Sequence, residues 1–210
     1  GGLFQTWNAG LFPGELNTGK VDDVKFLGKV LDDVQSVVNV DKKRIYAAGL
    51  SNGGMMSYRL ASEMSDRIAA IGAVGGTMAV EQYEPKRPVP VLHVHGTQDL
   101  LVPFNGPAKE TPKFLRFRSV DDTIAACIKA NGCDEKPTES KIEPKVDKLK
   151  VIRKLYGNGK NGSEVVLYVV EEGGHTWPGG ELNPPFLGAT TKNILANEVI
   201  WEFFRRHPLK

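Results

Sequence analysis

The residues that decide the fold are Gly49-Leu50-Ser51-Asn52-Gly53, a G-x-S-x-G sequence. The apolar run 44–48 before it predicts a buried strand, and residues 55–61 after it predict a helix. A strand, this pentapeptide and a helix in that order predict a nucleophile elbow, a strained turn that exposes the Ser51 hydroxyl. We expect glycines on both sides of Ser51 because such a tight turn leaves no room for side chains.

The composition predicts one ordinary globular domain over residues 1–210, with 40% hydrophobic and 25% charged residues. The net charge is only +2, and the basic residues form no stripe interleaved with aromatic ones, so a nucleic-acid partner is not expected. No apolar run approaches the roughly 18 residues of a membrane span. Two cysteines are too few for a zinc site or a disulfide scaffold, and no metal is expected.

Apolar runs and helical patterns alternate along the chain. Helices are predicted at 21–38, 119–130 and 194–206, and strands at 68–74, 89–95, 151–155 and 165–170. Residues 134–150 are polar and rich in Lys, Glu and Pro, and are expected to be a surface connection. This alternation predicts an α/β fold with a mostly parallel sheet flanked by helices.

Three polar residues follow predicted strands: Ser51, Asp99 and His175. In open α/β sheets ligands bind at the carboxyl ends of the strands. A serine hydroxyl is a poor nucleophile at neutral pH and needs a base, which an acid orients. The chain order Ser, Asp, His is that of α/β-hydrolases, so we predict these residues as a catalytic triad.

Each residue of this set has an alternative reading. Asp99 could be an ordinary turn residue. Of the other histidines, His93 lies inside a predicted strand and is expected in the core, His95 could line the site, and His207 is expected to be solvated. Only His175 combines the required order with a glycine-rich loop.

The oxyanion hole is only half visible in the sequence. One donor is expected to be the backbone N–H of Asn52, and the other should come from a loop after an earlier strand. No such strand precedes Trp7. We therefore expect the early strands of the fold to be missing from this sequence, and an N-terminal segment or a second chain to complete the sheet along the strand before Ser51.

The sequence resembles the polyhydroxybutyrate-depolymerase and feruloyl-esterase family of secreted α/β-hydrolases. The resembling segments are Trp7–Gly10, Val21–Val24, Gly49–Met56, His95–Asp99, Asn131–Cys133, Gly174–Gly180 and Ile200–Phe204. The resemblance implies ester hydrolysis on Ser51, Asp99 and His175, outside the cytoplasm and without a cofactor. Family members carry several strands before the Trp-Asn segment, which are absent here.

Other residues carry weaker expectations. Trp177, Thr77 and Met55 are candidates for substrate binding, although packing is an equal or better reading for Trp177 and for one of Met55 and Met56. Cys127 and Cys133 lie six apart across a helix end. A disulfide between them fits a secreted protein, and two free buried thiols are the alternative.

These features support a serine carboxylesterase acting on short-chain acyl, feruloyl or acetyl, or hydroxyalkanoate esters, small or polymeric. The alternative from another class is a non-catalytic binding module that keeps the fold. The intact triad argues against it, and the missing second oxyanion donor argues for it. A peptidase on the same fold uses the same chemistry.

Overall fold

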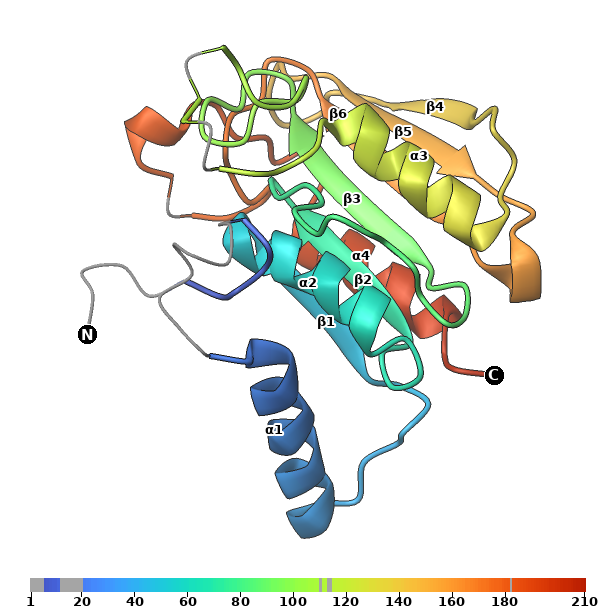
Figure 1. The fold of residues 1–210 in the computed structure, drawn as a ribbon. Helices are drawn as coiled ribbons and strands as arrows, with labels where there is room; N and C mark the ends of the chain where they lie inside the picture. Colours follow the sequence, from blue (N-terminus) through green and yellow to red (C-terminus); the bar gives the residue numbers. More distant parts are fainter. Residues whose placement is uncertain (1–5, 12–20, 110, 113–114, 182) are drawn as a thin grey trace.

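A six-stranded sheet, with helices on both faces, forms the described part of the chain (Figure 1). The structure is a computed structural model and describes residues 6–11, 21–109, 111–112, 115–181 and 183–210. The strands are β1 (Tyr46–Leu50), β2 (Ala70–Val74), β3 (Val91–Gly96), β4 (Thr138–Ile142), β5 (Val151–Tyr156) and β6 (Val165–Val170). The helices are α1 (Asp23–Val37), α2 (Asn52–Glu63), α3 (Val120–Asn131) and α4 (Ala196–Arg206), with short 3₁₀ turns at Lys160–Gly162 and Pro185–Leu187.

The strand order is β1-β2-β3-β6-β5-β4. The first four strands in this order are parallel, while β5 runs antiparallel to β6 and β4 antiparallel to β5. The predicted α/β class, the mostly parallel sheet and the adjacency of β5 and β6 are therefore confirmed. The carboxyl ends of β1, β2, β3 and β6 meet at one edge, which is where the candidate site lies.

Strand β4 corrects the expected surface connection at 134–150. Residues Thr138–Ile142 form an antiparallel strand on β5, and most of them are exposed. An edge strand with one neighbour buries little, so its polar, lysine-containing sequence lacks the apolar alternation that signals a strand.

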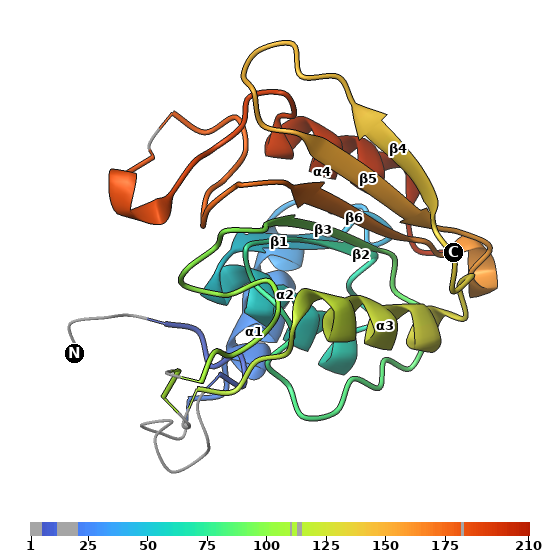
Figure 2. The same ribbon diagram turned by 90° about the horizontal axis from the view of Figure 1, so that it is seen from above.

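The two faces of the sheet carry separate apolar cores. Helices α1, α2 and α3 lie on one face and α4 on the other, as Figure 2 shows from above. On the α4 side, Phe203 and Phe204 pack with Ile200 against the sheet, and the rings of Tyr46 and Phe204 stack at 4.5 Å. A Cβ on Gly72 would lie 2.9 Å from the Ile200 side chain, so this glycine allows the close approach of α4.

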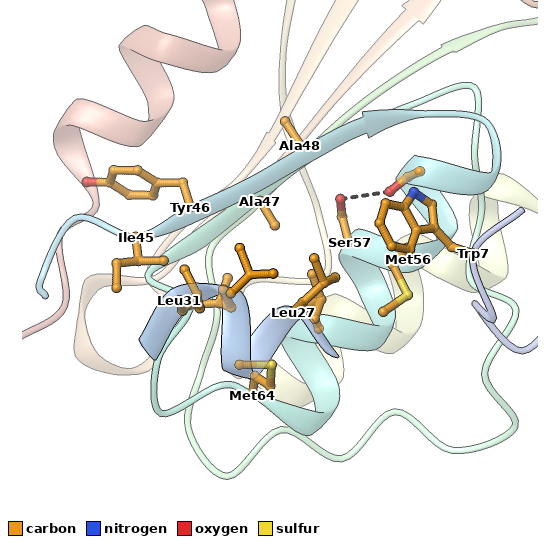
Figure 3. Close-up of a pocket in the computed structure, with 14 residues that line it drawn as sticks. Trp7, Leu27, Leu31, Ile45, Tyr46, Ala47, Ala48, Met56, Ser57 and Met64 are labelled. Carbon is orange, nitrogen blue, oxygen red and sulfur yellow. Dashed lines mark hydrogen bonds between the residues drawn. The ribbon is translucent and has the colours of Figure 1, made fainter. Parts of the chain in front are cut away.

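Strand β1 is an edge of the sheet, paired only with β2 in the described structure. A groove of about 280 Å³ runs beside it, between α1 and α2 (Figure 3). Its lining is mostly apolar and includes Leu27 and Leu31 of α1, Ala47 of β1 and Met64 of α2. Helix α1 also exposes four apolar side chains, of which Val30 lines the groove: Phe26, Val30, Val34 and Val37.

Among the described residues, no helix is long and apolar enough to cross a membrane.

Candidate active site

Ser51 occupies the turn between β1 and α2 with φ 56° and ψ −122°. A positive φ is unfavourable for a residue with a side chain, and it is maintained here by hydrogen bonds on both sides. The Ser51 N–H donates to the Val74 carbonyl of β2 at 2.8 Å, and the Ser51 carbonyl accepts from the Met55 N–H at 3.0 Å. The strained elbow predicted from the sequence is therefore present.

The glycines around this turn have different reasons to be there. A Cβ on Gly49 would lie 2.5 Å from the Gly53 backbone, and one on Gly76, beyond β2, only 2.1 Å from the Ser51 carbonyl oxygen. The expectation for Gly53 was wrong, because a Cβ there meets no atom within 4 Å. Gly53 instead lines the open groove beside β1, where a side chain has room.

Asp99 and His175 form a buried pair at the carboxyl edge of the sheet. His175 Nδ1 lies 2.7 Å from Asp99 Oδ2, and the two residues are 4% and 3% exposed. The other Asp99 oxygen accepts the backbone N–H groups of Leu101 at 2.9 Å and Val102 at 2.8 Å. These bonds fix the carboxylate, which in turn leaves His175 Nε2 as the free nitrogen of the ring. The predicted contact between Asp99 and His175 is confirmed.

Gly75 and Gly76 link this pair to Ser51. A Cβ on Gly75 would come within 3.3 Å of His175 Nδ1, and the next residue, Gly76, touches the Ser51 carbonyl. The two glycines that follow β2 have no side chains, and their backbone lies between the serine turn and the Asp–His pair. The triad also predicts a hydrogen bond between Ser51 Oγ and His175, and the hydrogen bonds of the described residues do not include it. Such bonds are often long before substrate binds.

Asn52 begins α2, so its backbone N–H has no acceptor within the helix and is available to an oxyanion. Its side chain has a second task that the sequence did not indicate. The side-chain amide oxygen of Asn52 accepts the backbone N–H of Trp7 at 2.6 Å, and the side-chain amide nitrogen donates to the backbone carbonyl of Trp7 at 3.1 Å. This two-way bond fixes the residue 6–11 segment over the start of α2.

Two of the three candidate substrate-binding residues are buried. Met55 is 2% exposed and packs in the core on the α2 side, because its position on the helix faces the sheet. Its assignment to substrate binding was therefore wrong, and the alternative of a core residue is confirmed. Thr77 is fully buried, and its hydroxyl has no hydrogen-bond partner among the described residues. Trp177 donates its indole N–H to Asn197 of α4 at 3.0 Å and packs in the α4-side core.

Cys127 and Cys133 are both free and buried, so the expected disulfide was wrong. Cys127 faces the core beside Tyr83, where burial raises the pKa of its thiol to about 12. The helix ends at Gly132 with φ 64°, and the chain then turns toward the loop between β5 and β6. There the Cys133 thiol donates to the Ser163 carbonyl at 3.8 Å. The helix end therefore directs the two thiols to different partners.

His93 and His95 lie on one face of β3 and are almost completely buried. Tyr58 of α2 is 2.7 Å from His93 Nδ1, His93 Nε2 is 3.0 Å from His95 Nδ1, and His95 Nε2 is 2.8 Å from the Val102 carbonyl. Desolvation lowers the pKa of His93 well below its usual value, with the neighbouring His95 adding to the effect, and desolvation likewise lowers the pKa of His95. Their spacing of two in the sequence was the available signal.

A serine on a strained strand-to-helix turn, with an Asp–His pair at the same edge of a mostly parallel sheet, defines an α/β-hydrolase. An acetyl xylan esterase from Aspergillus awamori has a similar fold, with a TM-score of 0.54 at 14% identity, over 80% of this chain and 65% of that one.

Residues 21–125, half of the chain, match the phospholipase/carboxylesterase family, and the protein belongs to that family of α/β-hydrolases. It is 34% identical to the putative esterase NocK of Nocardia uniformis subsp. tsuyamanensis over 96% of this chain and 62% of that protein. It is 31% identical to feruloyl esterase B of Piromyces equi over 89% of this chain and 34% of that protein. The chain thus spans less than two thirds of the length of these relatives.

Proposed function

We propose that the protein is a serine carboxylesterase. One observation carries this proposal: a serine on a strained turn and a hydrogen-bonded Asp–His pair lie at the carboxyl ends of parallel strands in one sheet. Ser51 has φ 56°, and His175 Nδ1 lies 2.7 Å from Asp99 Oδ2. The family match and the esterase names of its relatives support the same reaction class.

The proposed mechanism uses each group as its position allows. His175 Nε2 takes the proton of Ser51 Oγ as the oxygen attacks the ester carbonyl, and the imidazolium that forms is stabilised by Asp99. The Asn52 N–H donates to the developing oxyanion. His175 then protonates the leaving alcohol, and water attacks the acyl-enzyme by the same route in reverse.

For the substrate, we propose acetyl or feruloyl esters carried on polysaccharides. The support is the names of this chain's relatives: feruloyl esterases B and D, a probable feruloyl esterase C, and a bifunctional acetylxylan esterase/xylanase from Neocallimastix patriciarum. Hydroxyalkanoate esters stay a second substrate class on the sequence resemblance alone. We also propose that the enzyme acts outside the cell, where polysaccharide esters are found.

The test is hydrolysis of p-nitrophenyl acetate by the wild type and by Ser51→Ala, followed by methyl ferulate, acetylated xylan and a hydroxybutyrate ester. Removal of a triad serine lowers turnover by ~10⁴-fold or more. Turnover that survives in Ser51→Ala would refute the serine mechanism. Wild-type protein with no turnover on any of these esters would favour a binding module instead.

We further propose that an extended segment from outside the 210 residues pairs with β1 and covers its groove. The support is the one-sided pairing of β1 in the described structure, the apolar groove beside it and the exposed apolar side chains of α1. An uncovered edge of this kind promotes aggregation. Such a segment would also bring a second N–H to the oxyanion, whose loss costs about 3–4 kcal/mol. Sedimentation and turnover of residues 1–210 alone test this: a soluble monomer with turnover equal to that of a longer form contradicts it.

A further inference from the structure

Tyr58, His93 and His95 form a hydrogen-bonded chain that ends on the Val102 carbonyl, and its last ring nitrogen lies 3.4 Å from the carboxylate of the Asp–His pair. The chain crosses from α2 to β3 and then to the loop after β3, and all three side chains are at most 1% exposed. None of them belongs to the proposed triad. A buried polar chain of this length needs every donor and acceptor matched, so its hydrogen positions can be worked out.

The direction of the chain is fixed at its last member. The Val102 carbonyl can only accept, so His95 Nε2 must carry a hydrogen at the 2.8 Å contact. Burial lowers the pKa of His95 and favours its neutral ring, in which Nδ1 is an acceptor and His93 Nε2 donates to it at 3.0 Å. His93 Nδ1 is then also an acceptor, and the Tyr58 hydroxyl donates to it at 2.7 Å. Every donor therefore points toward the loop that holds Asp99.

The last N–H reaches Asp99 by two routes. His95 Nε2 lies 3.4 Å from Asp99 Oδ2, the oxygen that accepts from His175. It also holds the carbonyl of Val102, whose own N–H donates to Asp99 Oδ1 at 2.8 Å. The His95 ring is fixed in place by stacking on His93 at 5.2 Å and by an edge contact with Phe104 at 5.8 Å. The ring that faces the carboxylate is thus packed on two sides, and it adds to the backbone bonds that orient Asp99.

We propose that His95 is a positioning residue for the esterase reaction, held in its tautomer by the Val102 carbonyl on one side and by the His93 donor on the other. His95 sets the orientation of Asp99, and through Asp99 that of His175, without touching the substrate. This inference rests on the proposed function for its kinetic consequence, but the tautomer assignment does not depend on activity.

The first experiment is NMR of ¹⁵N-histidine-labelled protein at neutral pH. We expect a protonated Nε2 and a bare Nδ1 for both His93 and His95, assigned with His93→Gln and His95→Gln. In Tyr58→Phe, which removes one hydroxyl, His93 Nδ1 loses its donor, so we expect its ¹⁵N shift to move while His93 Nε2 stays protonated, because His95 Nδ1 still accepts from it. A protonated Nδ1 on His95 in the wild type would overturn the proposal.

The second experiment compares the kinetics of His95→Phe, His95→Gln and Tyr58→Phe with those of the wild type. Outer partners of catalytic groups typically contribute about 10- to 100-fold, and we expect His95→Phe to lose that much kcat with little change in KM. His95→Gln keeps an N–H donor at the end of the side chain and should recover part of the loss. Tyr58→Phe should lose a smaller part of kcat.

Folding and function are separated by the controls. Tyr58→Phe and His95→Gln test the proposal even if His95→Phe fails to fold. If Ser51→Ala abolishes turnover while folded His95→Phe keeps wild-type kcat, the positioning role is wrong and the esterase stands. If wild-type turnover does not depend on Ser51, the proposed function is wrong, and the NMR result still tests the hydrogen-bonded chain.

Discussion

A Cβ on Gly76 would lie 2.1 Å from the carbonyl oxygen of Ser51, although the two residues belong to turns after different strands. The serine turn is therefore shaped by the end of β2 as much as by its own pentapeptide. Since the contacting atom is backbone, a side chain at position 76 has to displace the serine turn itself.

We expect Gly76→Ala to destabilise the fold by about 1–3 kcal/mol, as overpacking does. It should also lower kcat by about 10²-fold, because a displacement of the nucleophile by 1 Å has that cost. Urea unfolding and ester turnover measure the two effects. Wild-type turnover in folded Gly76→Ala would contradict the argument.

Gly53→Ala is the matched comparison for stability. A Cβ there meets nothing within 4 Å, and alanine favours a helix by about 1 kcal/mol over glycine. We expect a free energy of unfolding equal to that of the wild type or higher. A loss comparable to that of Gly76→Ala would show that Gly53, like Gly76, has no room for a side chain.

Asp99→Asn should keep the fold and lose turnover. An amide can donate toward His175 Nδ1, which favours the tautomer whose Nε2 carries the hydrogen and cannot accept the serine proton. In a triad of this kind the loss of kcat is about 10⁴-fold. End-point assays at high enzyme concentration can measure the residual rate. A drop in kcat of less than tenfold would remove Asp99 from the proposed triad.

Asn52→Ala separates the backbone from the side chain at the start of α2. The N–H offered to the oxyanion remains, while both bonds to Trp7 are lost, at a cost of about 1–2 kcal/mol. We expect kcat to stay within about tenfold of the wild type and the Trp7 segment to become cleavable by protease. A loss as deep as that of Ser51→Ala would show that the side chain itself acts in the reaction.

The thiol of Cys127 makes stability depend on alkaline pH. Its pKa is raised from 9.0 to about 12 in the folded protein, so the unfolded chain loses this proton first. Burial of the protonated thiol contributes fully to the free energy of unfolding below pH 9. This contribution is lost as the pH rises toward 12, and the free energy of unfolding falls by up to about 1.4 kcal/mol per pH unit. Urea unfolding between pH 8 and 10.5 should show this fall in the wild type and a shallower one in Cys127→Ala. A titration of the denatured, unreduced protein should find two thiols.

The sequence predicted the sheet edge where Ser51, Asp99 and His175 lie, because each follows an apolar run ended by polar or glycine residues. It could not predict the β4 strand, whose exposed residues carry no apolar alternation. It also missed the role of His95. Two histidines that are two residues apart on a strand share a face of the sheet, but only the fold shows that Tyr58 and Val102 stand at the two ends of their chain.

The cysteines show where spacing misleads. Cys127 and Cys133 are close along the chain, and a helix end between them suggests that the chain reverses. The direction of a side chain after a helix depends on the turn at Gly132, and that turn leads Cys133 to Ser163 rather than back to Cys127.

The segments after β3 and β6, which carry Asp99 and His175, gather above one end of the sheet (Figure 1). Close to the sheet they are joined: the Gln98 N–H donates to the Gly173 carbonyl at 2.8 Å, and the Thr97 N–H to the Val170 carbonyl at 3.0 Å. Farther along, each segment is held at further points: the His95 ring bonds to the Val102 carbonyl at 2.8 Å, and the His175 N–H donates to the Leu187 carbonyl at 2.7 Å. Outside these contacts, both segments can change in length and sequence while the pair stays in register. Descendants of this chain can therefore acquire new substrates through the outer parts of two loops and inherit the same chemistry.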